Sequence, residues 1–139
     1  MNDKNVWNLT DIYTNEQEFN SAVSKLYKII EEIKKFQGTL SENAERIFDC
    51  YKTYEEALKI DEKLYSYAML KYHKDMSKTD SIKLYKKVEK ISTDFSEAVS
   101  FIEPEISKIS DEKLKEYEEN EKLKEYEKNI KDIIKGKKH

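Results

Sequence analysis

The feature that most constrains this chain is its scarcity of turn-forming residues, since 139 residues include two glycines and one proline. Sandwiches and barrels of β-strands need a turn residue every few positions, so this composition argues against them. Charged residues make up 40% of the sequence, which could also indicate disorder, but ten tyrosines and five phenylalanines are too many buriable rings for that. We therefore predict an all-α fold in a single helical domain, residues 1–139.

Apolar residues recur every three or four positions in several segments, and each segment is bounded by a capping signal. The first helix should begin at a capping box formed by Thr14 and Gln17 and end at Gly38 in the left-handed conformation. The second should begin at Ser41, and the polar stretch Lys74–Thr79 should be the loop that follows it. These two helices are long enough to be the main elements of a bundle.

Further signals divide the second half of the chain. A third helix should begin at residues 79–80 and kink or end at Pro104, because proline lacks an amide donor and clashes with the preceding turn. Ser110 should start a short helix, the chain should break again near Asn120, and a final amphipathic helix should run to Gly136. The apolar stripes are wider than a coiled-coil seam, so we predict an antiparallel bundle of three long helices plus shorter C-terminal helices.

Charge and composition argue against several partners. The net charge is −3 with both signs interleaved, and Arg46 is the only arginine, so no basic surface for nucleic acid is expected. Cys50 is alone, which fits a reducing compartment. No secretory signal and no apolar run of the ~20 residues that span a bilayer is found, so we expect a cytoplasmic protein without a membrane partner.

No set of residues suited to catalysis emerges from the sequence. His73 and His139 are the only histidines, and neither belongs to an H-E-x-x-H motif, which would place two imidazoles and a glutamate around one zinc ion. Cys50 has no neighbouring histidine, and two glycines cannot form a phosphate-binding loop. We expect no catalytic residue, no metal ligand and no cofactor in this chain, and no enzymatic activity of the chain alone.

Two features have competing interpretations. The tyrosines between Tyr51 and Tyr72 could form a binding surface, because tyrosine is favoured at interfaces, or could pack in the core with their hydroxyl groups at its edge. Asp61 interrupts the apolar stripe of the second helix and could be a buried functional acid or a residue at the rim of the core. We favour packing for the tyrosines and the rim position for Asp61.

Three segments resemble the oligoendopeptidase F family, in the order and spacing found there. Residues 6–13, VWNLTDIY, are similar to the family's opening W-D-L-T-D-I-Y, and residues 64–68, LYSYA, resemble its second-helix segment. Residues 95–106, FSEAVSFIEPEI, closely resemble its S-E-A-L-S-F-L-E-P-E-I signature. The residues that carry this resemblance as a candidate structural signature are Trp7, Asp11, Tyr13, Tyr65, Phe101 and Pro104.

The resemblance implies a role for the chain as part of a larger enzyme. Members of this family are zinc metallopeptidases that hydrolyse short peptides, and their H-E-x-x-H motif lies far downstream of the segment represented here. The chain would then be the N-terminal helical domain, without the catalytic domain, and would shape the substrate cleft. Its partner would be the catalytic domain of the parent peptidase, with short peptides bound only through the full enzyme. The alternative is a free-standing helical protein-interaction module without enzymatic activity.

Two further expectations concern burial. Trp7 is followed by apolar residues outside any predicted helix, so its indole should pack against the helices. Ile130, Ile133 and Ile134 have few apolar partners nearby in the sequence, so we expect them to form a face that the catalytic domain covers. Without that domain, the chain should self-associate through this face or order its last helix poorly.

Overall fold

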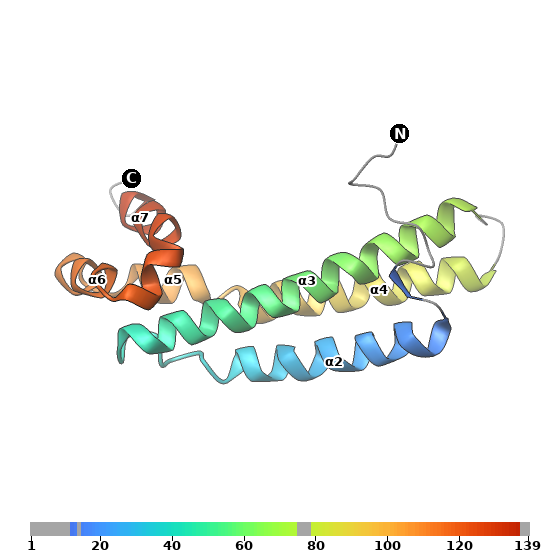
Figure 1. Ribbon diagram of the computed structural model, residues 1–139, viewed down its shortest axis with the longest axis horizontal. Helices are drawn as coiled ribbons and strands as arrows, with labels where there is room; N and C mark the ends of the chain where they lie inside the picture. Colours follow the sequence, from blue (N-terminus) through green and yellow to red (C-terminus); the bar gives the residue numbers. More distant parts are fainter. Residues whose placement is uncertain (1–11, 14, 75–78, 137–139) are drawn as a thin grey trace. The chain divides into compact units, whose positions relative to one another are not determined.

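The computed structural model describes residues 12–13, 15–74 and 79–136, and these residues form helices and turns without any strand (Figure 1). The predicted all-α fold is confirmed. The helices in chain order are α2 (Glu16–Lys34), α3 (Ala44–Lys74), α4 (Thr79–Val99), α5 (Ile102–Ser107), α6 (Asp111–Glu118), the 3₁₀ helix η1 (Glu121–Tyr126) and α7 (Glu127–Gly136).

The chain divides into two compact units. Unit 1 is formed by Met1–Ile30 and Glu56–Ser96, and unit 2 is formed by Glu31–Glu55 and Glu97–His139. The division falls within α2, α3 and α4, so each of these helices contributes residues to both units. Whether the units act as one domain, as the sequence analysis expected, stays a prediction.

Unit 1 is built from three helical segments that bury one apolar stripe each. Phe19 of α2 stacks on Tyr67 of α3 with ring centroids 5.3 Å apart, and the phenylalanine is fully buried. Asp61 of α3 is half-buried and accepts a hydrogen bond of 2.7 Å from Ser92 Oγ of α4. This partial burial agrees with the predicted position of Asp61 at the rim of the core. The buried side chains of the three stripes are Phe19, Val23, Leu26, Ile29 and Ile30 of α2, Ala57, Leu64, Tyr67 and Ala68 of α3, and Ser81, Leu84, Val88, Ile91 and Phe95 of α4.

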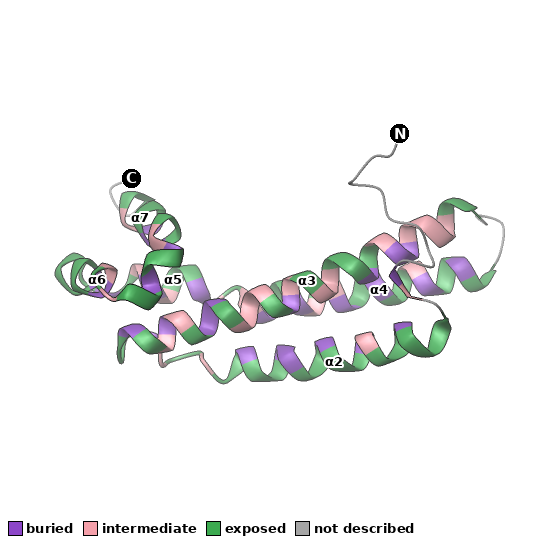
Figure 2. Cartoon of the chain, viewed as in Figure 1, coloured by how far each residue is buried: buried purple, intermediate pink, exposed green. Residues whose placement is uncertain are grey.

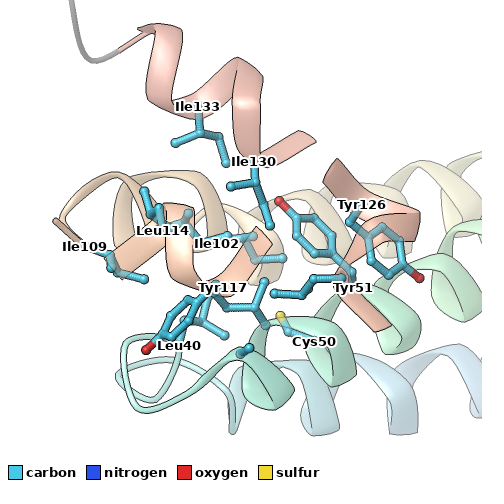
Figure 3. Close-up of a cluster of buried hydrophobic side chains, with 14 residues drawn as sticks. Leu40, Cys50, Tyr51, Ile102, Ile109, Leu114, Tyr117, Tyr126, Ile130 and Ile133 are labelled. Atoms are coloured by element: carbon cyan, nitrogen blue, oxygen red, sulfur yellow. The ribbon is translucent and has the colours of Figure 1, made fainter. Parts of the chain in front are cut away.

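Unit 2 has its own apolar core, to which the start of α3 and the C-terminal helices contribute (Figure 3). Helix α7 contacts α5, α6 and η1, and α6 also contacts η1. The core consists of Leu40, Ala44, Ile47, Cys50, Tyr51, Ile102, Ile106, Ile109, Leu114, Tyr117, Leu123, Tyr126, Ile130 and Ile133. The C-terminal third of the chain therefore packs against a segment some 70 positions earlier in the sequence.

Asparagines rather than hydroxyl residues cap the first two long helices. Asn15 Oδ1 accepts from the amide of Glu18, and Asn43 Oδ1 accepts from the amide of Arg46, both at 2.9 Å. Each contact satisfies one of the amides that the first turn of a helix leaves without a partner. The predicted cap Thr14 lies outside the described residues. The prediction of Ser41 as the cap of α3 is wrong, because that helix begins three positions later.

Predictions for the later helix ends are partly confirmed. Ser110 Oγ accepts from the amide of Lys113 and so caps α6, and Asn120 caps the following helix in the same manner. That following helix begins as the 3₁₀ helix η1 rather than as an α-helix. Gly38 adopts the left-handed conformation, with φ of +86°, as predicted, but the prediction that the first helix ends there is wrong, because α2 ends at Lys34 and turns follow.

The prediction that Pro104 kinks or ends the third helix is wrong. Helix α4 already ends at Val99, and Ser100 Oγ donates to the carbonyl of Glu97 at 2.7 Å in the turn that follows. Pro104 lies in the first turn of α5, where an amide would have no partner within the helix, so the missing donor costs nothing there.

Burial follows the helical period along each element, with exposed residues opposite the buried stripes (Figure 2). None of the helices in the described part of the chain is long and apolar enough to cross a membrane.

Candidate functional site

No metal centre is formed by the part of the chain that the structure describes. No group of three or more histidine, cysteine, aspartate or glutamate side chains comes together there in a way that could hold an ion. His73 is exposed at the C-terminal end of α3, with Tyr72 as its ring neighbour at 6.0 Å, and His139 lies outside the described residues. These residues do not fit the zinc ion of the family that the sequence resembles.

Cys50 is not suited to act as a nucleophile. Its side chain lies in the core of unit 2, and burial, together with the nearby carboxylate of Glu105, raises the pKa of the thiol from its usual 9.0 to about 12. The thiolate is the reactive form, so the thiol is inert at neutral pH. Cys50 therefore acts as a small apolar core residue.

Residues 95–106, the segment that resembles the family signature, include a glutamate that binds the turn between α2 and α3. The carboxylate of Glu105 in α5 accepts from two backbone amides, those of Gly38 at 2.5 Å and Leu40 at 3.1 Å. Ile102 and Ile106 anchor α5 in the core, whereas Phe101 is half-buried and Pro104 is exposed. We call this contact the Glu105 clamp. It fixes the left-handed turn between α2 and α3, so the chemistry of this segment is structural.

A second set of contacts holds the C-terminal helices onto the first part of α3. The ring of Tyr126 stacks on Tyr51 with centroids 4.9 Å apart (Figure 3). The Tyr126 hydroxyl group donates a short hydrogen bond to the carboxylate of Glu55. Burial and this carboxylate both raise the pKa of Tyr126. The Tyr117 hydroxyl donates to the carbonyl of Ser41 at 3.1 Å. A buried tyrosine whose hydroxyl group has a hydrogen-bond partner stabilises a fold, so these contacts are structural.

The expected interface isoleucines lie in this same core. Ile130 and Ile133 are buried, and Ile134 is partly buried against the cluster. An exposed face made of these three isoleucines is therefore not present, because Ile130 and Ile133 belong to the core of unit 2, in which α7 contacts α5, α6 and η1. Self-association of the chain stays a prediction, now without this surface as its reason.

The other signature positions differ in their surroundings. Trp7 and Asp11 lie outside the described residues. Tyr13 is half-buried and meets the rings of Phe19 and Tyr67 edge-on, at 6.0 and 5.4 Å. Tyr65, by contrast, is 46% exposed.

A cluster of partly exposed apolar side chains forms around Tyr65 in unit 1. Tyr72 stacks on Tyr85 of α4 with centroids 5.3 Å apart, and Tyr65 lies 6.4 Å from the same ring. Met69 is half-buried between Tyr65 and Tyr72 on one face of α3, and Ile82 is exposed one turn before Tyr85. We call these five residues the tyrosine face. The packing interpretation thus holds for Tyr51 and Tyr67, which are buried, but not for Tyr65.

Sequence reasoning did not single out Ile82, and it placed Tyr85 with the apolar face of its helix. Their exposure depends on which side of α4 meets the core. Leu84 and Val88 are buried and Tyr85 is half-exposed, so the side of α4 bearing Tyr85 and Ile82 lies away from the centre of the core. The periodicity of the sequence does not decide which side of α4 meets the core, because apolar residues lie on both sides: Leu84 and Val88 on one, Ile82 and Tyr85 on the other.

A shallow hollow of about 560 Å³ in unit 2 is another candidate for a ligand. Arg46 lies over the ring of Phe36 at 5.3 Å, and Lys35 and Lys52 add two more positive charges. Glu32 and Asp49 line the same hollow, and Lys52 pairs with Glu125 at 3.0 Å. Opposite charges so close together select neither an anion nor a cation.

Comparison with known proteins gives clear relatives, although no family model matches the chain. The oligoendopeptidase F homolog of Borreliella burgdorferi is 29% identical over 100% of this chain and 23% of its own length. The oligopeptidase PepF of Bacillus subtilis is 25% identical over 82% of the chain and 17% of its own length. The crystal structure of oligoendopeptidase-F from Enterococcus faecium matches with a TM-score of 0.76 and 31% identity, over 90% of this chain and 25% of that one. The chain thus spans a quarter or less of these relatives, and the predicted resemblance is confirmed.

Proposed function

We propose that this homologue of one part of oligoendopeptidase F is the N-terminal, non-catalytic helical domain of a peptidase that hydrolyses short peptides. The observation that carries the proposal is the similarity to the E. faecium structure, which extends over nine tenths of this chain but only a quarter of its counterpart. Three quarters of that relative have no counterpart here. The role of this segment is to form part of the wall of the substrate cleft.

The contacts in the described residues support a structural role. The Glu105 clamp and the contacts of Tyr117 and Tyr126 fix the turn and the C-terminal helices of unit 2. The thiol of Cys50 is buried, and no set of metal ligands comes together in the described ranges 12–13, 15–74 and 79–136. The chain therefore contributes a stiff helical element, and no step of peptide hydrolysis is assigned to it.

The partner in this proposal is the catalytic domain of the parent peptidase, and zinc belongs to that domain. Short peptides would bind only in the complete enzyme. The alternative, a free-standing interaction module, draws its support from the tyrosine face alone. A cytoplasmic location and burial of Trp7 stay predictions.

A chimera tests the proposal. The quarter of E. faecium oligoendopeptidase-F that aligns with this chain is replaced by the chain, and hydrolysis of a quenched short peptide is measured with and without a chelator. We expect the chimera to retain chelator-sensitive hydrolysis, while the same enzyme with that quarter deleted loses it. A folded chimera that is no more active than the deletion variant contradicts the proposal.

A further inference from the structure

Large apolar side chains that remain exposed are few and unevenly distributed. Among the described residues, three are at least 36% exposed: Tyr27 at 38%, Tyr65 at 46% and Ile82 at 36%. Two of the three belong to the tyrosine face, where they flank the stacked rings of Tyr72 and Tyr85. Single exposed apolar residues need no explanation, but a contiguous group does.

Helical geometry makes the tyrosine face continuous. Tyr65, Met69 and Tyr72 are spaced by four and three positions, so they form one ridge along α3. Ile82 and Tyr85, three positions apart, form a second ridge at the start of α4. The ring contacts of Tyr85 with Tyr65 and Tyr72 join the two ridges.

In the same unit, the side-chain contacts at the surface between α2 and α4 are polar rather than aromatic. Lys87 Nζ donates to Asn20 Oδ1 at 3.1 Å, and the Tyr27 hydroxyl donates to Asp94 Oδ2 at 3.2 Å. Lys90 also contacts Asp94, at 3.3 Å. Polar groups thus line the junction of α2 and α4, as expected for a surface in water. At the tyrosine face the junction of α3 and α4 presents aromatic rings, although the same two helices also share the hydrogen bond between Asp61 and Ser92.

We propose that the tyrosine face is the surface on which the rest of the peptidase polypeptide docks. The inference rests on the proposed function, and it specifies which surface of unit 1 makes the contact. Relatives at least four times as long as the matched segment supply a large covalently linked partner. Ile130 and Ile133 of α7 do not offer such a surface, because both are buried, and Ile134 is partly buried against the same core.

The composition of the face indicates the chemistry of its partner. Tyrosine and methionine are enriched in the centres of interfaces, where rings supply apolar area and hydroxyl groups supply hydrogen bonds. Three tyrosines and no charged side chain make up the five residues. The docking partner therefore presents apolar side chains toward the rings and carbonyl oxygens toward the hydroxyl groups.

Binding in trans tests the inference. E. faecium oligoendopeptidase-F without the aligned quarter is immobilised, and binding of this chain is measured for wild type, Tyr65→Lys and Ile82→Lys. Tyr27→Lys is the matched control, because this exposed tyrosine of unit 1 lies at the polar junction of α2 and α4. Helical content by circular dichroism and the urea midpoint show that each variant is folded.

We expect Tyr65→Lys and Ile82→Lys each to weaken binding at least about tenfold, as loss of a central interface residue does, while Tyr27→Lys binds like wild type. If wild type binds and the three folded variants bind equally well, the docking face is wrong and the proposed function stands. If wild type does not bind the truncated enzyme at all, the inference fails together with the proposed function. If Tyr65→Lys instead converts a self-associated chain to monomers without changing binding to the enzyme, the occupant is a second copy and the inference is overturned.

Discussion

Replacing Glu105 by alanine removes the clamp on the left-handed turn between α2 and α3. The Gly38 amide is exposed and can turn to water, so losing its partner costs little. The Leu40 amide is partly buried, and leaving such a donor unsatisfied costs about 1–3 kcal/mol. Because both hydrogen bonds are charge-assisted, we expect Glu105→Ala to lower the free energy of unfolding by about 2–4 kcal/mol. Glu105→Gln keeps one neutral acceptor and should cost about half as much.

Glu103→Ala is the matched control for this prediction. Glu103 is exposed and shares the first turn of α5 with Glu105, so both carboxylates lie at the favourable end of the helix dipole. The difference between the two alanine variants therefore isolates the clamp. Urea unfolding followed by circular dichroism gives the free energies, and hydrogen exchange of the Leu40 amide gives a local measure, fast in Glu105→Ala and slow in Glu103→Ala. Equal stability of the two variants, within about 0.5 kcal/mol, would refute the reasoning.

Two further predictions concern the core of unit 2. Ile130→Ala should lower the free energy of unfolding by about 2–5 kcal/mol, because the side chain is fully buried. Ile82→Ala, at an exposed position, should change it by less than about 0.5 kcal/mol. Similar urea midpoints for the two variants would show that Ile130 is not in a core. The Cys50 thiol should resist alkylation at pH 8 until urea unfolds the chain. Because folding raises the pKa of the thiol, the folded state favours its protonated form. The stability that the protonated thiol contributes is complete below pH 9 and is lost as the pH rises toward 12. Cys50→Ala should lose stability less steeply than wild type between pH 9 and 11, and parallel curves would show that the thiol is not protected.

Local chemistry explains which parts of the fold were predictable. Ser110 and Asn120 mark the starts of helices through their own side-chain geometry, and Gly38 marks the turn between α2 and α3 through its backbone, so the sequence identifies them without knowledge of distant residues. Pro104 was misjudged because proline disrupts the interior of a helix but fits its first turn, and the end of α4 at Val99 carries no equally strong signal.

The candidate surfaces depended on contacts that the sequence does not reveal. Ile130 and Ile133 are buried in a core in which α7 contacts α5, α6 and η1, so their burial depends on tertiary contacts among the short C-terminal helices, which helical periodicity does not specify. The exposure of Tyr65 likewise depends on the rotation of α3 about its axis, since Leu64, Tyr67 and Ala68 in the same stretch are buried. Periodicity identifies a buried stripe, but its edges are set by the neighbouring helices.

We propose that this chain acts through the rest of a peptidase and carries out no step of hydrolysis itself. The most direct test of this proposal is a titration of E. faecium oligoendopeptidase-F lacking the aligned quarter with the wild-type chain, while hydrolysis of a quenched short peptide is followed. The account predicts no hydrolysis by either polypeptide alone and a saturable, chelator-sensitive recovery of hydrolysis as the chain is added. Hydrolysis by the chain alone, or no recovery at a chain concentration that saturates binding, would contradict it.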